Sequence, residues 1–235
     1  MEKLELLYEG KAKQVYSTAN EDEYIIHYKD DATAGNGAKH DQFEGKGVLN
    51  NTISGIIFDM LEEAGIKTHM IDKLNDRDIL VKKVHIFPLE VIVRNITTGS
   101  FCKRLGAPEG VVLKTPIFEI CYKNDAYGDP LINEDHAIAL GICTREEYAY
   151  IKETTLKINE LLKAFFLNLG LKLVDFKIEF GKTKEGEILL ADEISPDSCR
   201  LWDVETNQKY DKDVFRQDIG DLIETYKAVL ARMQK

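Results

Sequence analysis

Charged and apolar side chains alternate along Leu173–Phe180, where Asp175, Lys177 and Glu179 take every second position. A β-strand would place these three side chains on one face and the apolar residues between them on the other. The next apolar run ends directly at Asp192. If the two runs pair as a hairpin, Asp192 faces Glu179, and carboxylates at a strand end suit Mg²⁺. A solvated strand face would explain the first run alone, but the acids that end the second run favour a site.

A basic segment near the N-terminus, YEGKAKQVY (Tyr8–Tyr16), runs from a glycine into a predicted strand. The backbone N–H groups around Gly10 and the ammonium groups of Lys11 and Lys13 would favour phosphate oxygens. The segment is neither a Walker A sequence nor a GxGxxG sequence. Taken alone, it is better explained as a solvated basic turn.

A third segment, EVIVRNITTGS (Glu90–Ser100), delivers Arg94 to a loop rich in hydroxyl groups and glycine. A guanidinium with neighbouring hydroxyls is a common way to hold a phosphate monoester. The alternative is an arginine that pairs with one of the many acids of the chain.

These segments need strands and helices to position them, and the hydrophobic spacing predicts which ones. The predicted strands are Lys13–Ser17, Tyr24–Tyr28, Leu80–Val84, Leu89–Val93 and a hairpin of Leu173–Phe180 with Glu187–Ile194. The predicted helices are Phe43–Ala64 with Gly65 as its C-cap, Tyr150–Leu169 and Asp213–Met233. Loops are expected over Asp30–Gly37 and, as a long irregular stretch, over Asn95–Asn133. Strands first, then helices with a hairpin, predict an α+β fold in two lobes.

The overall composition fits a soluble globular chain of 235 residues with a net charge of −10. Such a charge disfavours binding to nucleic acids, although a local cluster of lysine and arginine can still bind a small anion. The four cysteines form no CxxC pair, and the histidines form no HExxH site. The charged N-terminus lacks the apolar core of a signal peptide, and no run is long enough to span a membrane. We therefore expect a cytoplasmic protein with neither nucleic-acid nor membrane partners.

Several segments in the same order resemble the phosphoribosylaminoimidazole-succinocarboxamide synthases over nearly the whole chain. They are YEGKAKQVY (Tyr8–Tyr16), KGVLNN (Lys46–Asn51), VKK (Val81–Lys83), EVIVRN with TTGS (Glu90–Ser100), KNDAYGDP (Lys123–Pro130), LVDFKIEFG (Leu173–Gly181) and DEISPDSCRLWD (Asp192–Asp203). The resemblance implies a kinase-like ATP cleft between a small β lobe, residues 1–85, and a larger α+β lobe, residues 86–235. GNG at Gly35–Gly37 is a departure, because related enzymes vary there, and it leaves Asn36 without an assigned role.

The implied reaction joins L-aspartate to carboxyaminoimidazole ribonucleotide (CAIR), with ATP as co-substrate and Mg²⁺ as cofactor, in purine biosynthesis. ATP would convert the CAIR carboxylate to an acyl phosphate, and the aspartate amine would then displace phosphate. The family also suggests a homo-oligomer, often a dimer.

The residue patterns and the resemblance together assign roles to individual positions. Catalysis is assigned to Lys177 and Asp175. ATP binding is assigned to Gly10, Lys11, Ala12, Lys13, Lys82, Val84 and Glu179. Substrate binding is assigned to Arg94, Ser100, Lys123, Asp197 and Arg200, and metal binding to Asp192, Glu179 and Asp129.

Two other functions compete with the ligase. A small-molecule kinase would release ADP without aspartate and would be expected to carry an HRD-like loop, which the sequence lacks. A non-catalytic nucleotide-binding module would not need Arg94, Lys177, Glu179 and Asp192 together.

Overall fold

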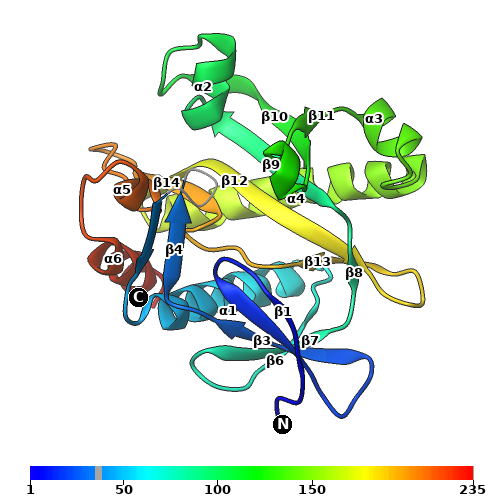
Figure 1. The fold of residues 1–235 in the computed structure, drawn as a ribbon. Helices are drawn as coiled ribbons and strands as arrows, with labels where there is room; N and C mark the ends of the chain where they lie inside the picture. Colours follow the sequence, from blue (N-terminus) through cyan, green and yellow to red (C-terminus); the bar gives the residue numbers. More distant parts are fainter. Residues whose placement is uncertain (35–38, 235) are drawn as a thin grey trace.

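A computed structural model describes residues 1–34 and 39–234 of the chain. The fold is α+β with antiparallel sheets, as predicted. A small sheet holds the N-terminal segment, and a larger sheet runs across the middle of the molecule (Figure 1). Within the described residues, no helix is both long and apolar enough to cross a lipid bilayer.

The small sheet has the strand order β1-β2-β3-β7-β6. Its strands are β1 (Leu6–Glu9), β2 (Lys13–Ser17), β3 (Glu23–Tyr28), β6 (Met70–Lys73) and β7 (Asp78–Lys82). The predicted strands at β2, β3 and β7 are confirmed within two residues. A separate hairpin pairs β4 (Asp31–Ala34) with β5 (Lys39–Gln42), so the predicted loop is wrong over β4. The turn predicted at Gly35–Gly37, with Asn36, lies outside the described residues.

The larger sheet has the order β11-β10-β9-β12-β13, and β8 and β14 also pair with β12. Its strands are β8 (His85–Ile86), β9 (Leu89–Ile96), β10 (Val112–Tyr122), β11 (Leu131–Ile132), β12 (Leu171–Lys182), β13 (Ile188–Ala191) and β14 (Cys199–Asp203). The predicted hairpin is confirmed, because Glu179 of β12 lies opposite Ala191 of β13. β12 is the longest of these strands and crosses the centre of the molecule (Figure 1).

The irregular stretch predicted for Asn95–Asn133 is wrong. It contains α2 (Gly99–Leu105), β10, a 3₁₀ turn (Asp125–Tyr127) and β11. Pro116 lies where the register of β10 shifts against β9, between Val112 and Ile117. A strand tolerates a proline at such an irregularity, so the proline does not end β10.

The longer helices are α1 (Lys46–Glu63), α4 (Arg145–Asn168) and α6 (Leu222–Met233), and the shorter ones are α3 (Glu134–Ala139) and α5 (Asp213–Arg216). α4 begins five residues before the predicted start, at a capping box of Thr144 and Glu147. The predicted helix over Asp213–Met233 is wrong as a single element, because the chain leaves the helix after Arg216 and Asp221 caps a new one.

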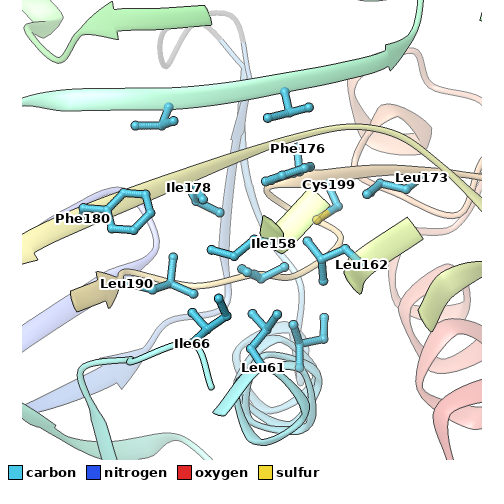
Figure 2. Close-up of a cluster of buried hydrophobic side chains, with 14 of the residues drawn as sticks. Leu61, Ile66, Ile158, Leu162, Leu173, Phe176, Ile178, Phe180, Leu190 and Cys199 are labelled. Atoms are coloured by element: carbon cyan, nitrogen blue, oxygen red, sulfur yellow. The ribbon is translucent and has the colours of Figure 1, made fainter. Parts of the chain in front are cut away.

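The main core lies between α1, α4 and the larger sheet. Figure 2 shows Leu61 of α1, Ile158 of α4, and Phe176 and Ile178 of β12 in one cluster of side chains. All four side chains are buried. α1, although its sequence lies between strands of the small sheet, therefore packs with the larger sheet.

Strand alternation along β12 holds except at one position. The register shifts between Leu173 and Asp175 in the pairing with β14. Val174 consequently packs with Ile96 and Trp202, not in the main cluster with Phe176. The predicted apolar face was therefore wrong at Val174, because a bulge interrupts the two-residue period.

Candidate active site

Three acids surround Lys177 on β12. Its ammonium nitrogen Nζ lies 2.8 Å from Glu179 Oε1, 3.2 Å from Asp192 Oδ2 and 3.8 Å from Glu90 Oε1. Burial alone would lower the pKa of Lys177, but Glu179, Asp192 and Glu90 outweigh it and hold the pKa well above its ordinary value. Lys177 is therefore a positive charge held among carboxylates, and of the two acids that the strand pattern places beside it, Glu179 contacts it.

Lys13 brings the small sheet to the same site. It extends from β2, and its ammonium donates to Asp192 Oδ1 and lies 3.5 Å from Glu193 Oε2. The ring of Tyr28 packs 5.1 Å from Lys13 Nζ. Burial opposes the charge, yet the two carboxylates raise the pKa of Lys13 above its ordinary value. An ion pair between the two sheets thus contributes to the site.

Asp192 sits between both lysines in an uncommon backbone conformation. Its φ of 62° is in the left-handed region, which aspartate tolerates better than most residues. Burial would raise the pKa of this carboxyl, but Lys13 and Lys177 lower it below the ordinary value. Strained backbone positions of this kind concentrate at functional sites.

A second charged cluster is centred on Asp175, which lies two residues before Lys177 on β12. Asp175 Oδ2 accepts from Arg94 Nη1 at 3.0 Å and from Arg200 Nη1 at 2.8 Å. Arg94 Nη2 also donates to Ser100 Oγ at 3.2 Å. A side chain on Gly99 would have its Cβ 2.8 Å from Arg200 Nη2, so glycine leaves room for the guanidinium there. Two guanidinium groups and a hydroxyl are thus held together.

The remaining predicted residues divide by position. Lys123 joins the first cluster, because its Nζ lies 2.7 Å from Glu179 Oε2. Asp197 lies in a neighbouring buried group, where Lys46 Nζ is 2.6 Å away and the Tyr226 hydroxyl donates to it. Burial would raise the pKa of Asp197, but Lys46 and Lys212 lower it.

Two of the predicted residues are more peripheral. Lys11 is exposed and pairs with Asp125 at 2.8 Å. Asp129 accepts from the Asn124 N–H at 2.8 Å within its own turn. Gly10 and Ala12 flank Lys11 in the connection between β1 and β2.

Lys82 and Val84 lie where the chain passes from the small sheet to the larger one. Lys82 is exposed at the end of β7. A Cβ on Gly181 of β12 would be 2.4 Å from Val84 Cγ2, so Val84 packs closely against the backbone of β12.

Sequence reasoning missed the roles of Glu90, Glu193 and Lys46. Glu90 alternates with Ile92 and Arg94 along β9, a two-residue period that could have pointed to a shared face. The sequence places Glu193 among the carboxylates at the end of the second strand, but it does not predict the contact with Lys13. Lys46 looks in sequence like a surface lysine at a helix start, yet its side chain is fully buried.

The acids of the first cluster have the chemistry that Mg²⁺ prefers. Mg²⁺ in nucleotide sites is usually held by one or two carboxylates together with phosphate oxygens. Asp192 and Glu179 supply two such carboxylates, bridged by Lys177. No cluster of three or more His, Cys, Asp or Glu side chains placed to hold a metal occurs in the described residues. Two carboxylates suit a metal ion whose other ligands come from nucleotide phosphates.

A hollow of about 580 Å³ elsewhere is lined by His85, Phe87, Glu147 and Lys182, among others. None of the predicted site residues lines it. We therefore place the site by its chemistry, at the two clusters along β12.

Lysines and carboxylates from two sheets converge on one strand end, beside a pair of arginines, and this arrangement suits a nucleotide-dependent enzyme with anionic substrates. Comparison with known proteins narrows this class. The chain matches the SAICAR synthetase family over residues 6–233. The chain belongs to this family.

Individual relatives match this chain over nearly its full length. The phosphoribosylaminoimidazole-succinocarboxamide synthase of Finegoldia magna is 67% identical over 231 residues, which cover 98% of this chain and 100% of the relative. The crystal structure of the Ehrlichia chaffeensis enzyme is 46% identical, covers 98% of both chains and has a TM-score of 0.96. A SAICAR synthetase solved in complex with ADP is 52% identical, covers 96% of both chains and has a TM-score of 0.94.

These relationships confirm the predicted fold and activity. The chain is an ATP-dependent ligase of purine biosynthesis. It condenses L-aspartate with CAIR to give the succinocarboxamide product (SAICAR), ADP and phosphate. Neither the small-molecule kinase nor the non-catalytic binding module is supported.

Proposed function

We propose that the ligase reaction takes place along the polar face of β12, with Lys177 as its central cation. The observation that carries this proposal is the position of Lys177 between Glu179 and Asp192, while Lys13 from the other sheet contacts the same Asp192. Because the site takes one lysine from each sheet, it fits a nucleotide that is held where the two sheets meet.

ATP is assigned to the side of the site nearest the small sheet. The backbone of Gly10–Ala12 and the ammonium groups of Lys11 and Lys13 would face its phosphates. Lys82, Val84 and Glu179 would contact the rest of the nucleotide. The close packing of Val84 on Gly181 supports a rigid connection there.

CAIR is assigned to the arginine cluster. Arg94, Ser100 and Arg200 would bind its 5′-phosphate, because a planar guanidinium can pair with two phosphate oxygens. Lys123 and Asp197 complete the predicted substrate residues. Asp175 already accepts hydrogen bonds from both guanidinium groups. Because both guanidinium groups already engage its Oδ2, we assign Asp175 to orienting the arginines and the ribonucleotide.

Asp192 and Glu179, with Asp129 as the third predicted ligand, would hold Mg²⁺. When bound, the metal would neutralise charge on the nucleotide phosphates.

The chemical steps follow from the weakness of a carboxylate as an electrophile. A CAIR carboxylate oxygen attacks the γ-phosphorus of ATP, the bond to the bridging oxygen breaks, and ADP leaves. The aspartate amine then attacks the carbonyl carbon, phosphate leaves, and the nitrogen loses a proton. Lys177 would stabilise the negative charge on the oxygens in the first step, while the protein holds the reactants in line.

Three broader assignments belong to the same proposal. We place the lobe boundary near residue 85, where the chain passes from β7 to β8, with α1 packed into the larger lobe. We place the enzyme in the cytoplasm, supported by four cysteines that form no disulfide. We assign it a homodimer, which is supported by the family resemblance alone.

ADP release tests the proposed function directly. With ATP, CAIR and Mg²⁺ present, ADP should accumulate only after L-aspartate is added, in step with SAICAR. Replacement of Mg²⁺ by EDTA should stop release. Steady ADP production that does not respond to aspartate would indicate a kinase or an ATPase instead.

A further inference from the structure

Glu193 is a buried acid with few partners. The residue is 6% exposed, and its Oε2 accepts no hydrogen bond within the described part of the chain. Its ion pair is with Lys13 Nζ, at 3.5 Å. The nearby Asp197, in contrast, accepts from both Lys46 and Tyr226. Because a buried polar group without a hydrogen bond is destabilising, Glu193 needs an explanation.

Lys13 explains why Glu193 is left without a donor. The ammonium donates to Asp192, and its distance of 3.5 Å from Glu193 Oε2 is beyond the usual hydrogen-bond length. A shift of about 0.5 Å would bring it into the usual range of N–H···O bonds. The ring of Tyr28, 5.1 Å from the same nitrogen, bounds its position without occupying a donor.

In the proposed function, Lys13 loses its closer partner, Asp192. If Asp192 holds a metal that is shared with the nucleotide, its carboxylate is no longer free to pair with Lys13. A buried lysine that loses a carboxylate partner is strongly destabilised unless another anion replaces it. Glu193 is the carboxylate already in place on the same loop.

We propose that Glu193 is a positioning residue for Lys13, and that it takes over the Lys13 ammonium when Asp192 turns to the bound nucleotide. This inference rests on the proposed roles of Lys13 and Asp192. It makes the pairing of Lys13 with Asp192 one of two alternatives. The second pairing keeps the lysine aimed at the phosphates while Asp192 is engaged.

A double-mutant cycle on ADP affinity tests the inference. We would measure the Kd of ADP by titration calorimetry for wild type, Glu193→Gln, Lys13→Met and the double variant, in Mg²⁺ and in EDTA. In Mg²⁺, Glu193→Gln should raise the Kd at least about tenfold, because it strips a buried charge of its partner. In EDTA the rise should stay within about twofold, because Asp192 retains Lys13.

The cycle separates this role from two others. In the Lys13→Met background, Glu193→Gln should have little further effect, since the pair has already been removed. An effect that persists there would make Glu193 a metal ligand or a structural residue and overturn the inference. Glu147→Gln is the matched control. Glu147 pairs with Lys182 at a distance of 2.6 Å, and neither residue belongs to the proposed site. It should leave ADP affinity unchanged.

The outcomes also separate the inference from the proposed function. If Lys13→Met itself leaves ADP affinity unchanged, the assignment of Lys13 fails. If Lys13→Met weakens ADP binding and Glu193→Gln does not, the inference alone fails.

A wild-type structure with ADP and Mg²⁺ gives a test that does not depend on the folding of any variant. It should show Lys13 hydrogen-bonded to Glu193 and separated from Asp192. Lys13 still paired with Asp192 would overturn the inference.

Discussion

Single side chains in this site are shared between several partners. Arg94 is 4% exposed and uses its three nitrogens on Glu119, Asp175 and Ser100. Its planar group is therefore held in one orientation before any ligand binds. Such preorganisation lowers the entropy lost when a phosphate is bound.

Arg94→Lys tests this geometry because it keeps the charge and removes the fork. We expect the KM for CAIR to rise about tenfold or more, while the KM for ATP stays within about twofold. Arg104→Lys is the control, since Arg104 contacts the other oxygen of Glu119. Steady-state kinetics of both variants measure the difference. Equal effects on CAIR in both, or none in Arg94→Lys, would remove Arg94 from the phosphate site.

The sequence predicts those site residues that follow a strand period. Lys177, Glu179 and Asp192 meet as expected, because β12 and β13 pair in the predicted hairpin. Lys46 could not be predicted in this way. Its burial depends on Asp197, 151 positions along the chain, which is a tertiary contact without a local pattern.

At the scale of elements, a short connection ties the two sheets together at His69. Its backbone N–H donates to Leu190 of β13 at 2.8 Å, and its carbonyl accepts from Lys82 of β7 at 2.7 Å. The imidazole is buried, and burial together with the nearby Lys13 lowers its pKa to about 4. Because an unfolded histidine has a pKa of about 6.5, the unfolded chain binds more protons between these values.

Stability should therefore fall as the pH drops below about 6.5, by about 1.4 kcal/mol per pH unit from this histidine. Between pH 7.5 and 5.0, urea unfolding of wild type should lose about 2 kcal/mol more than that of His69→Gln. Burial and Asp213 raise the pKa of Asp211 to about 7, which acts in the opposite sense. Both proteins share that effect, so the comparison isolates His69. Parallel pH curves would contradict the account.

Elements were predictable where one period runs without interruption. The strands β2 and β3 could be predicted in this way. β10 could not, because Pro116 and a register shift break its pattern. The break between α5 and α6 was also missed. There the apolar spacing continues while Asp218, with a φ of 54°, ends the helical path.

At the scale of the whole molecule, an acidic chain gathers cations at one site and pairs each of them with carboxylates. Within a net charge of −10, three lysines lie among Glu90, Glu179, Asp192 and Glu193, and two arginines lie around Asp175. The lysines come from both sheets, so the charge balance at Asp192 depends on how the sheets meet. The bound nucleotide phosphates would enter where the cations are already paired.

The kcat of Lys177→Met tests the central claim, that Lys177 stabilises charge in the transition state. Methionine keeps much of the bulk and removes the charge. We expect kcat to fall at least about a hundredfold, with ADP and CAIR affinities within a few-fold, because the interaction strengthens only in the transition state. Lys182→Met, on the same strand and paired with Glu147, should keep a near-normal kcat. A Lys177→Met enzyme with near wild-type kcat and only a lower Tm would contradict the account.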